Sequence, residues 1–103
     1  MRKKSLTMLA LLFVAAPAMA VDVRGRVDFL GPSGPFPMAR AEVRLCNVQY
    51  GQCTTNYITG GDGMYYFQSL SPGPHAVIVN GRERWQVLLP AAQAFDIAPT
   101  QGN

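Results

Sequence analysis

Residues 60–67, GGDGMYYF, group the residues of this chain that could most readily do chemistry: one carboxylate among glycines, followed by bulky side chains. A glycine-rich turn with an aspartate can hold a metal ion or a phosphate. A calcium loop needs several oxygen ligands at regular spacing, and this stretch supplies only Asp62. A phosphate cradle needs a helix to begin behind the glycines, whereas a strand pattern follows here. We therefore interpret Gly61, Asp62 and Gly63 as a turn, in which both glycines take positive φ and Asp62 accepts hydrogen bonds from local N–H groups.

Cys46 and Cys53 are the only cysteines of the chain. An even number of cysteines in an exported protein is typical of a disulfide bond. The alternatives are a redox pair or a metal site, but the spacing is not C-x-x-C and His75 is the single histidine. The intervening sequence NVQYGQ offers Tyr50-Gly51 as a turn. We predict a Cys46–Cys53 disulfide that ties two neighbouring strands near their loop, with no metal and no cofactor.

His75 opens the β-branched run HAVIVN and faces inward on its period-two pattern. A half-buried imidazole at a strand start could sense pH between about 5 and 7. The plainer interpretation is that His75 packs in the core and hydrogen-bonds to a neighbouring loop. Both interpretations stay open at this stage.

Aromatic side chains on the outward faces of strands are the remaining candidates for a site. If Tyr65 and Phe67 point inward, Met64 and Tyr66 point outward. Grouped with Tyr50 and Tyr57, these outward residues would form a platform for a protein partner or a glycan. If these residues are instead scattered over the surface, they are ordinary exposed residues with no binding role.

Residues 1–20 have the pattern of a secretory signal peptide. A basic start, Met1–Lys4, precedes the apolar run Leu6–Ala16, and Ala18-Met19-Ala20 matches the small-x-small cleavage pattern. The apolar run is shorter than the roughly 20 residues that span a bilayer. We predict a mature chain that begins at Val21, has no membrane span, and resides in the periplasm or outside the cell.

The net charge of +3 comes from this leader. Three of the nine basic residues are Arg2, Lys3 and Lys4, so the mature part keeps six arginines against six acidic residues. A neutral mature chain gives no support for nucleic-acid binding.

Apolar residues alternate with polar ones throughout the mature sequence, which predicts strands and no helix. In the first predicted strand, Val23, Val27 and Phe29 are expected to face inward. The next run, LGPSGPFPM (30–38), is predicted to be a loop because of its prolines and glycines. Asn80-Gly81 predicts a hairpin turn. The seven expected strands cover residues 21–29, 41–45, 53–58, 65–68, 75–80, 85–89 and 94–98.

A single domain is predicted over residues 21–98, with a frayed tail at 99–103. Its core is expected to contain the inward-facing residues of each strand. These are Val23, Val27, Val43, Leu45, Tyr65, Phe67, His75, Val77, Val79, Trp85 and Val87.

The order of four motifs resembles the carboxypeptidase regulatory-like domains, a transthyretin-like β-sandwich family. The motifs are VRGRV (23–27), PMARAEVRL (37–45), TGGDGMYYF (59–67) and SLSPGPHAVIV (69–79). Two positions depart from the family pattern: Gly60 stands where an acidic residue is common, and His75 where a tyrosine is common. The resemblance implies a seven-stranded Greek-key β-sandwich. Since members mostly act as accessory modules, it implies fold more strongly than function.

We expect a non-enzymatic, exported module that binds another cell-envelope protein through a loop face or an exposed strand edge. No nucleophile elbow surrounds any serine of the mature chain, and no catalytic residues are assigned. The alternative is a small carbohydrate-binding module that uses Tyr50, Tyr57 and Tyr66 with arginine neighbours. A glycan is therefore the second candidate partner.

Overall fold

The structure is a computed structural model that describes residues 20–103, so the predicted signal peptide lies outside the described part apart from Ala20. All regular elements in this range are β-strands, and it holds no helix that could cross a membrane. The strands within residues 20–103 are β1 (Val21–Gly31), β2 (Gly34–Pro37), β3 (Glu42–Asn47), β4 (Tyr57–Ile58), β5 (Met64–Leu70), β6 (Gly73–Val79), β7 (Arg82–Leu89), β8 (Ala94–Asp96) and β9 (Thr100–Gln101).

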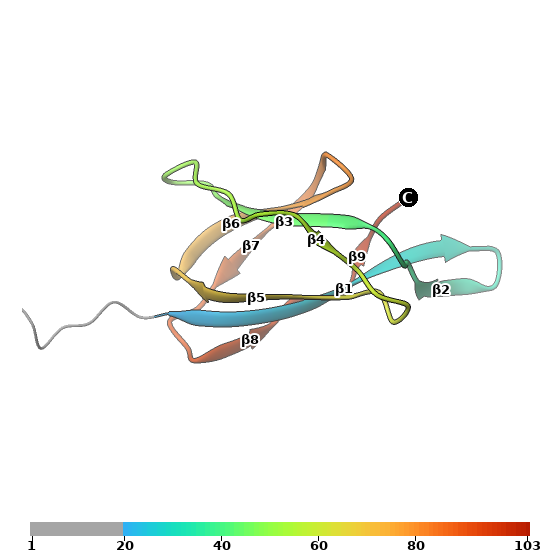
Figure 1. Cartoon of the computed structure of the whole chain (residues 1–103), viewed down its shortest axis with the longest axis horizontal. Coiled ribbons are helices and arrows are strands. Elements are labelled where there is room, and N and C mark those ends of the chain that lie inside the picture. Colours follow the sequence, from blue (N-terminus) through green and yellow to red (C-terminus); the bar gives the residue numbers. More distant parts are fainter. Residues whose placement is uncertain (1–19) are drawn as a thin grey trace, which may run out of the picture.

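The strands form two sheets, which lie as two layers in Figure 1. The first sheet is centred on β1. Residues of its first half pair with both β5 and β8, and residues of its second half pair with both β2 and β9. The second sheet has the order β4-β3-β6-β7, with antiparallel neighbours. Because β1 has partners on both sides, it is the element around which the rest of the first sheet is positioned.

One apolar core is shared by the two sheets. The first sheet contributes side chains such as Val23 and Tyr65, and the second contributes side chains such as Val43 and Val77. The alternation of apolar and polar residues along each strand explains this burial. Successive side chains of a strand point to opposite faces, and burying the apolar face is favourable because it removes apolar surface from water. Ten of the residues predicted for the core are buried: Val23, Val27, Val43, Leu45, Tyr65, Phe67, His75, Val77, Val79 and Val87.

Trp85 is the exception, since the prediction that it belongs to the core is wrong. Its side chain is 37% exposed. The indole Nε1–H donates a hydrogen bond to the Thr100 hydroxyl at 2.9 Å. An indole N–H needs a partner, and Trp85 finds it on β9 at the margin of the core instead of in the interior.

Beyond Val27, the alternation of β1 changes phase. Asp28 is buried and hydrogen-bonded to Arg26, whereas Phe29 is exposed, contrary to its predicted inward position. At this point β1 leaves β5 and β8 and begins to pair with β2 and β9. Phe29 therefore faces Phe36 of β2 in a hairpin and not the second sheet.

The predicted loop over residues 30–38 is wrong in part, because Gly34–Pro37 forms β2. This hairpin and the short strand β9 raise the number of strands in residues 20–103 from the seven expected to the nine observed. The prolines are tolerated because β2 pairs with β1 alone, and a sheet edge does not require every N–H to enter a ladder. The hairpin projects from the body in Figure 1.

Residues 99–103 were expected to fray, and the structure corrects this expectation. Thr100 and Gln101 pair with Val27 and Asp28 of β1. The Asn103 side chain accepts a hydrogen bond from the Leu30 N–H at 3.0 Å and donates one to the Leu30 carbonyl at 3.1 Å. The tail is thus tied to β1 from the base of the hairpin to Leu30 near its turn, a contact that no local pattern indicated.

The predicted Asn80-Gly81 hairpin is confirmed between β6 and β7. Asn80 has φ 51° and Gly81 has φ 81°. Positive φ at both central residues is the conformation that matches the twist of a two-residue hairpin.

Tyr65 is the largest fully buried side chain of the described chain. Its ring packs over Gly25 on the neighbouring strand, where it occupies the space that a Cβ would fill. The hydroxyl has no hydrogen-bond partner in residues 20–103. Burial raises the pKa of Tyr65 to about 12, and the nearby Thr100 hydroxyl opposes only part of that rise. Because the Tyr65 hydroxyl makes no hydrogen bond within residues 20–103, burial dominates.

We predict that Tyr65 makes the protein sensitive to alkaline pH. In the unfolded chain a tyrosine ionises near pH 10, while folded Tyr65 stays neutral up to about pH 12. The unfolded state therefore releases its proton first, and stability falls by about 2 kcal/mol as pH rises from 10 to 12. Urea unfolding at several pH values should show this loss in the wild type and in Tyr50→Phe, but not in Tyr65→Phe. An equal loss in Tyr65→Phe would contradict the assignment.

Candidate functional site

The turn at residues 60–63 performs a structural role in the described chain. Asp62 Oδ1 accepts a hydrogen bond from the Met64 N–H at 2.9 Å, and the Gly63 N–H donates to the Gly60 carbonyl at 2.9 Å. Gly63 has φ 72°, as predicted, but Gly61 does not have positive φ, so that part of the prediction is wrong. One left-handed residue is enough to reverse the chain here, because Asp62 closes the turn through its side chain.

The predicted Cys46–Cys53 disulfide is confirmed. It links the end of β3 to the chain that leads toward β4, and the two residues also form an isolated antiparallel bridge. The enclosed loop is further held by Asn47, whose Oδ1 accepts hydrogen bonds from the N–H groups of Gln49 and Tyr50. A disulfide is typical of an oxidising compartment, which is consistent with an extracellular or periplasmic location.

The four residues predicted for a partner or glycan surface do not form one patch. Tyr57 and Tyr66 lie together, with ring centroids 6.1 Å apart in an edge-on arrangement. Met64 is half-buried at the start of β5, opposite Arg26. Tyr50 is 75% exposed in the disulfide loop, at the other end of β3 from the residues that pair with Tyr57. A platform that combines Tyr50 with Tyr57 and Tyr66 is therefore not present.

His75 is buried near the start of β6, as predicted. Its Nδ1 lies 3.0 Å from the Gly73 carbonyl oxygen. A carbonyl can only accept, so this contact assigns the proton to Nδ1. The geometry matches the interpretation of His75 as a packed and hydrogen-bonded core residue.

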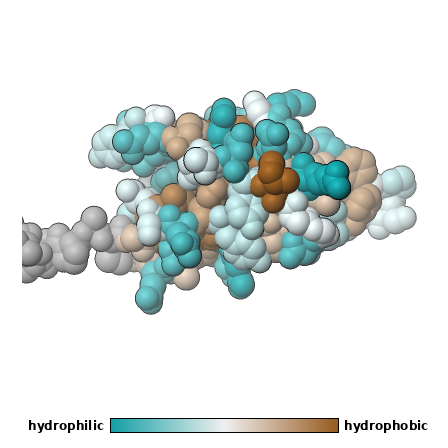
Figure 2. Space-filling model, in the orientation of Figure 1, coloured by the Kyte–Doolittle hydropathy of each residue, from teal (hydrophilic) through white to brown (hydrophobic). Residues whose placement is uncertain are grey.

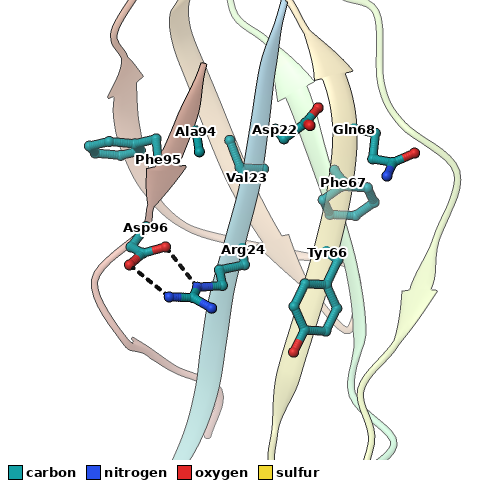
Figure 3. Close-up of a pocket in the computed structure, with 9 residues that line it drawn as sticks. All are labelled: Asp22, Val23, Arg24, Tyr66, Phe67, Gln68, Ala94, Phe95 and Asp96. Carbon is teal, nitrogen blue, oxygen red and sulfur yellow. Dashed lines mark hydrogen bonds and ion pairs between the residues drawn. The ribbon is translucent and has the colours of Figure 1, made fainter. Parts of the chain in front are cut away.

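A groove of about 650 Å³ lies on the outer face of β8, β1 and β5 (Figure 3). We call it the outer groove. It is lined by Asp22, Val23, Arg24, Tyr66, Phe67, Gln68, Ala94, Phe95 and Asp96.

The row of side chains across the outer groove comes from three paired strands. Asp96 of β8 is the register partner of Arg24, and Arg24 is the register partner of Tyr66 on β5. Cross-strand partners on one face stand close enough to interact. Figure 3 shows the Arg24 guanidinium turned toward the Asp96 carboxylate, with the Tyr66 ring on the adjacent strand.

Arg24 and Asp96 form a two-pronged ion pair. Arg24 Nε donates to Asp96 Oδ1 at 2.8 Å, and Nη2 donates to Oδ2 at 3.2 Å. These hydrogen bonds lower the pKa of Asp96 and raise that of Arg24. Both side chains are well exposed, so water screens the pair and it adds little to stability. Its main consequence is geometric: the two charged groups are fixed side by side at one end of the groove, next to Tyr66.

An irregularity in β5 shapes one end of the outer groove. Val21 pairs with Leu70 and Val23 with Phe67, so two residues of β5, Gln68 and Ser69, stand opposite Asp22. Ser69 has φ 60°, and its N–H donates to Asp22 Oδ1 at 2.9 Å. A bulge of this kind redirects the neighbouring side chain, and Gln68 lines the groove.

Sequence reasoning missed Arg24, Gln68 and Asp96 as site residues. The alternation of β1 does predict that Arg24 points outward. Nothing local indicates its partner, because Asp96 is 72 residues away and meets Arg24 only through parallel pairing of β8 with β1.

The second exposed feature is the hairpin of residues 29–37, which we call the β1–β2 arm. Phe29 and Phe36 pack with ring centroids 5.1 Å apart, and Leu30 and Phe36 remain 49% and 46% exposed. Residues 29–39 contain no charged side chain. In Figure 2 the end of the molecule that the arm occupies is brown or pale, whereas deep teal is concentrated over the rest of the face.

No protein-family model matches this chain, and comparison with curated proteins finds no significant match. The outer groove and the β1–β2 arm are therefore the observations on which a function can be argued.

Proposed function

We propose that this protein is an exported, non-catalytic interaction module that binds another cell-envelope protein through the β1–β2 arm. We further propose that its two sheets form a transthyretin-like Greek-key sandwich of the carboxypeptidase regulatory-like kind. The strand order β4-β3-β6-β7, in which β3 neighbours β6, supports a Greek-key connection.

The observation that carries the proposed function is an uncharged arm with exposed hydrophobic side chains. A small soluble domain rarely exposes neighbouring large apolar residues without a partner. Here Leu30 and Phe36 are half exposed, and the arm projects from the body where a partner can enclose it.

Side chains of the arm, and not its backbone, are suited to make the contact. The free edge of the arm belongs to β2, which contains Pro35 and Pro37. Proline has no N–H to donate, so this edge is a poor template for an added strand. The expected partner is a protein with an apolar pocket that receives Phe36 as its anchor, beside Phe29 on the same face of the arm.

Asn103 gives the arm a defined orientation. A two-stranded hairpin alone is marginally stable in water, but the Asn103 side chain makes two hydrogen bonds to the Leu30 backbone. Gly102 adds a third, from its N–H to the Asp28 carbonyl at 2.8 Å. A preorganised arm loses less conformational entropy on binding.

Site-specific photocrosslinking in the producing cells tests the proposed function. A benzoylphenylalanine at position 36 is expected to capture one defined envelope protein, while the same probe at Leu88, which is 69% exposed on β7, is not. Phe36→Asp should abolish co-purification of that protein, and Leu88→Asp should leave it intact. Adducts with lipid alone, or the same protein captured from both positions, would refute the proposal.

A further inference from the structure

The outer groove is separate from the β1–β2 arm, although both involve β1. Residues 22–24 of β1 contribute to the groove, whereas the arm begins at Phe29. Its volume of about 650 Å³ falls within the roughly 300–1,000 Å³ that is usual for small-molecule sites. What the groove can bind follows from the chemistry of its side chains.

The backbone of β1 in the floor of the outer groove is not free to pair with a ligand. β1 runs along the centre of the floor, and its backbone is engaged by β5 on one side and by β8 on the other. A peptide that binds by strand addition needs a free sheet edge. The floor offers no such edge, so a ligand here is recognised through side-chain contacts.

The ion pair places hydrogen-bond donors and acceptors next to one another. A guanidinium has five N–H donors, and Arg24 uses two of them on Asp96. The remaining donors lie beside the unused lone pairs of the Asp96 carboxylate. A hydroxyl group both donates and accepts, so two hydroxyls on adjacent carbons can bind Arg24 and Asp96 together.

The charge of the outer groove disfavours an anionic ligand. Among the residues that line the groove, Arg24 carries one positive charge, and Asp96 and Asp22 carry two negative charges. The net charge of the groove is therefore one negative. An anion would have to compete with Asp96 for Arg24 and would be repelled by Asp22. Gln68 adds an uncharged amide that can donate and accept.

Tyr66 supplies an apolar surface beside these polar groups. It is 47% exposed, and Tyr57 packs edge-on against it, which restricts the orientation of the ring. An aromatic ring with a restricted orientation provides contact area at a low entropic cost. Its face can cover the C–H surface of a sugar ring while Arg24 and Asp96 bind the hydroxyls.

From this juxtaposition we infer that the outer groove is a binding site for a neutral saccharide. Tyr66 contacts the apolar face of one sugar ring, and the Arg24–Asp96 pair binds neighbouring hydroxyls of the same ligand. Gln68 and Asp22 contact the ligand at the end of the groove shaped by the bulge. This site requires neither Tyr50 nor the β1–β2 arm.

Isothermal titration calorimetry with the purified protein tests the inference. The probes are soluble oligomers of glucose, mannose, galactose and N-acetylglucosamine, with oligogalacturonate as the anionic counterpart of the galactose oligomer. At least one neutral oligomer is expected to bind. Tyr66→Ala and Arg24→Gln should each weaken that affinity by about tenfold or more, while Tyr66→Phe, which keeps the ring, should retain most of it.

Tyr50→Ala is the matched control, because Tyr50 is an exposed tyrosine outside the groove. It should bind the saccharide as the wild type does. The inference is overturned if no neutral oligomer binds at millimolar concentration, if Tyr50→Ala weakens binding as much as Tyr66→Ala, or if oligogalacturonate binds as tightly as the galactose oligomer. Phe36→Asp should leave saccharide binding unchanged, which separates this test from that of the arm.

Discussion

Replacing Gly63 with alanine is expected to lower the free energy of unfolding by about 2–5 kcal/mol. Gly63 has φ 72°, a conformation that L side chains rarely adopt. A Cβ at this position would also lie 2.6 Å from the carbonyl oxygen of Val27, a backbone atom. That oxygen accepts the Met38 N–H at 2.8 Å, and the Val27 N–H donates to the Gly63 carbonyl at 2.9 Å. Since both polar groups of Val27 are engaged, the backbone cannot move away without losing hydrogen bonds.

Gly61→Ala is the control for this prediction, because it changes a glycine of the same turn. A Cβ at position 61 would meet no atom within 4 Å, and Gly61 does not have positive φ. Its stability should change by less than about 0.5 kcal/mol. Urea unfolding followed by Trp85 fluorescence measures both variants. Equal stability of Gly63→Ala and Gly61→Ala would contradict the packing of the turn against β1.

The features that were predictable from sequence are those specified by neighbouring residues. Val43 and Leu45, like Val77 and Val79, alternate with more exposed or smaller residues, so their inward direction follows from strand geometry alone. The Asn80-Gly81 turn carries its own conformational signal. These local rules do not depend on which strands become neighbours.

The features that escaped prediction depend on pairing between distant segments. Trp85 follows the inward alternation of β7, but the Thr100 hydroxyl on β9 offers its indole a partner at the margin of the core. Asp28 is buried because β1 exchanges one set of partners for another. The Arg24–Asp96 pair requires parallel register between β1 and β8. No local pattern encodes such registers, because each is set by the packing of the whole sheet.

Between the outer groove and the β1–β2 arm, β1 packs against β5 through Gly25, which lies under the ring of Tyr65. Gly25 is the register partner of Tyr65. A Cβ on residue 25 would lie 2.3 Å from the Tyr65 hydroxyl oxygen and 2.4 Å from Cζ. Covering a strand glycine with an aromatic ring from the next strand is a known way to compensate for its missing side chain. The ring is fully buried by its neighbours, so it cannot swing into solvent to make room.

Gly25→Ala is therefore expected to destabilise the protein by about 3 kcal/mol, the upper end of the range for overpacking a core. Urea unfolding measures the change. The loss should arise from the collision with the ring and not from alanine itself, because alanine in a strand is normally favoured over glycine by about 0.5–1 kcal/mol.

A double-mutant cycle separates these two causes. Tyr65→Leu removes the ring atoms that the new Cβ would strike, at a cost of its own in lost burial. In the Tyr65→Leu background, Gly25→Ala should be close to neutral, which gives a coupling of about 2–3 kcal/mol between the two positions. Tyr66→Leu, on the adjacent outward-facing residue, should give no such rescue. If Gly25→Ala is equally damaging in all three backgrounds, Tyr65 does not occupy the space above Gly25, and the register of β1 against β5 that forms the outer groove is wrong as well.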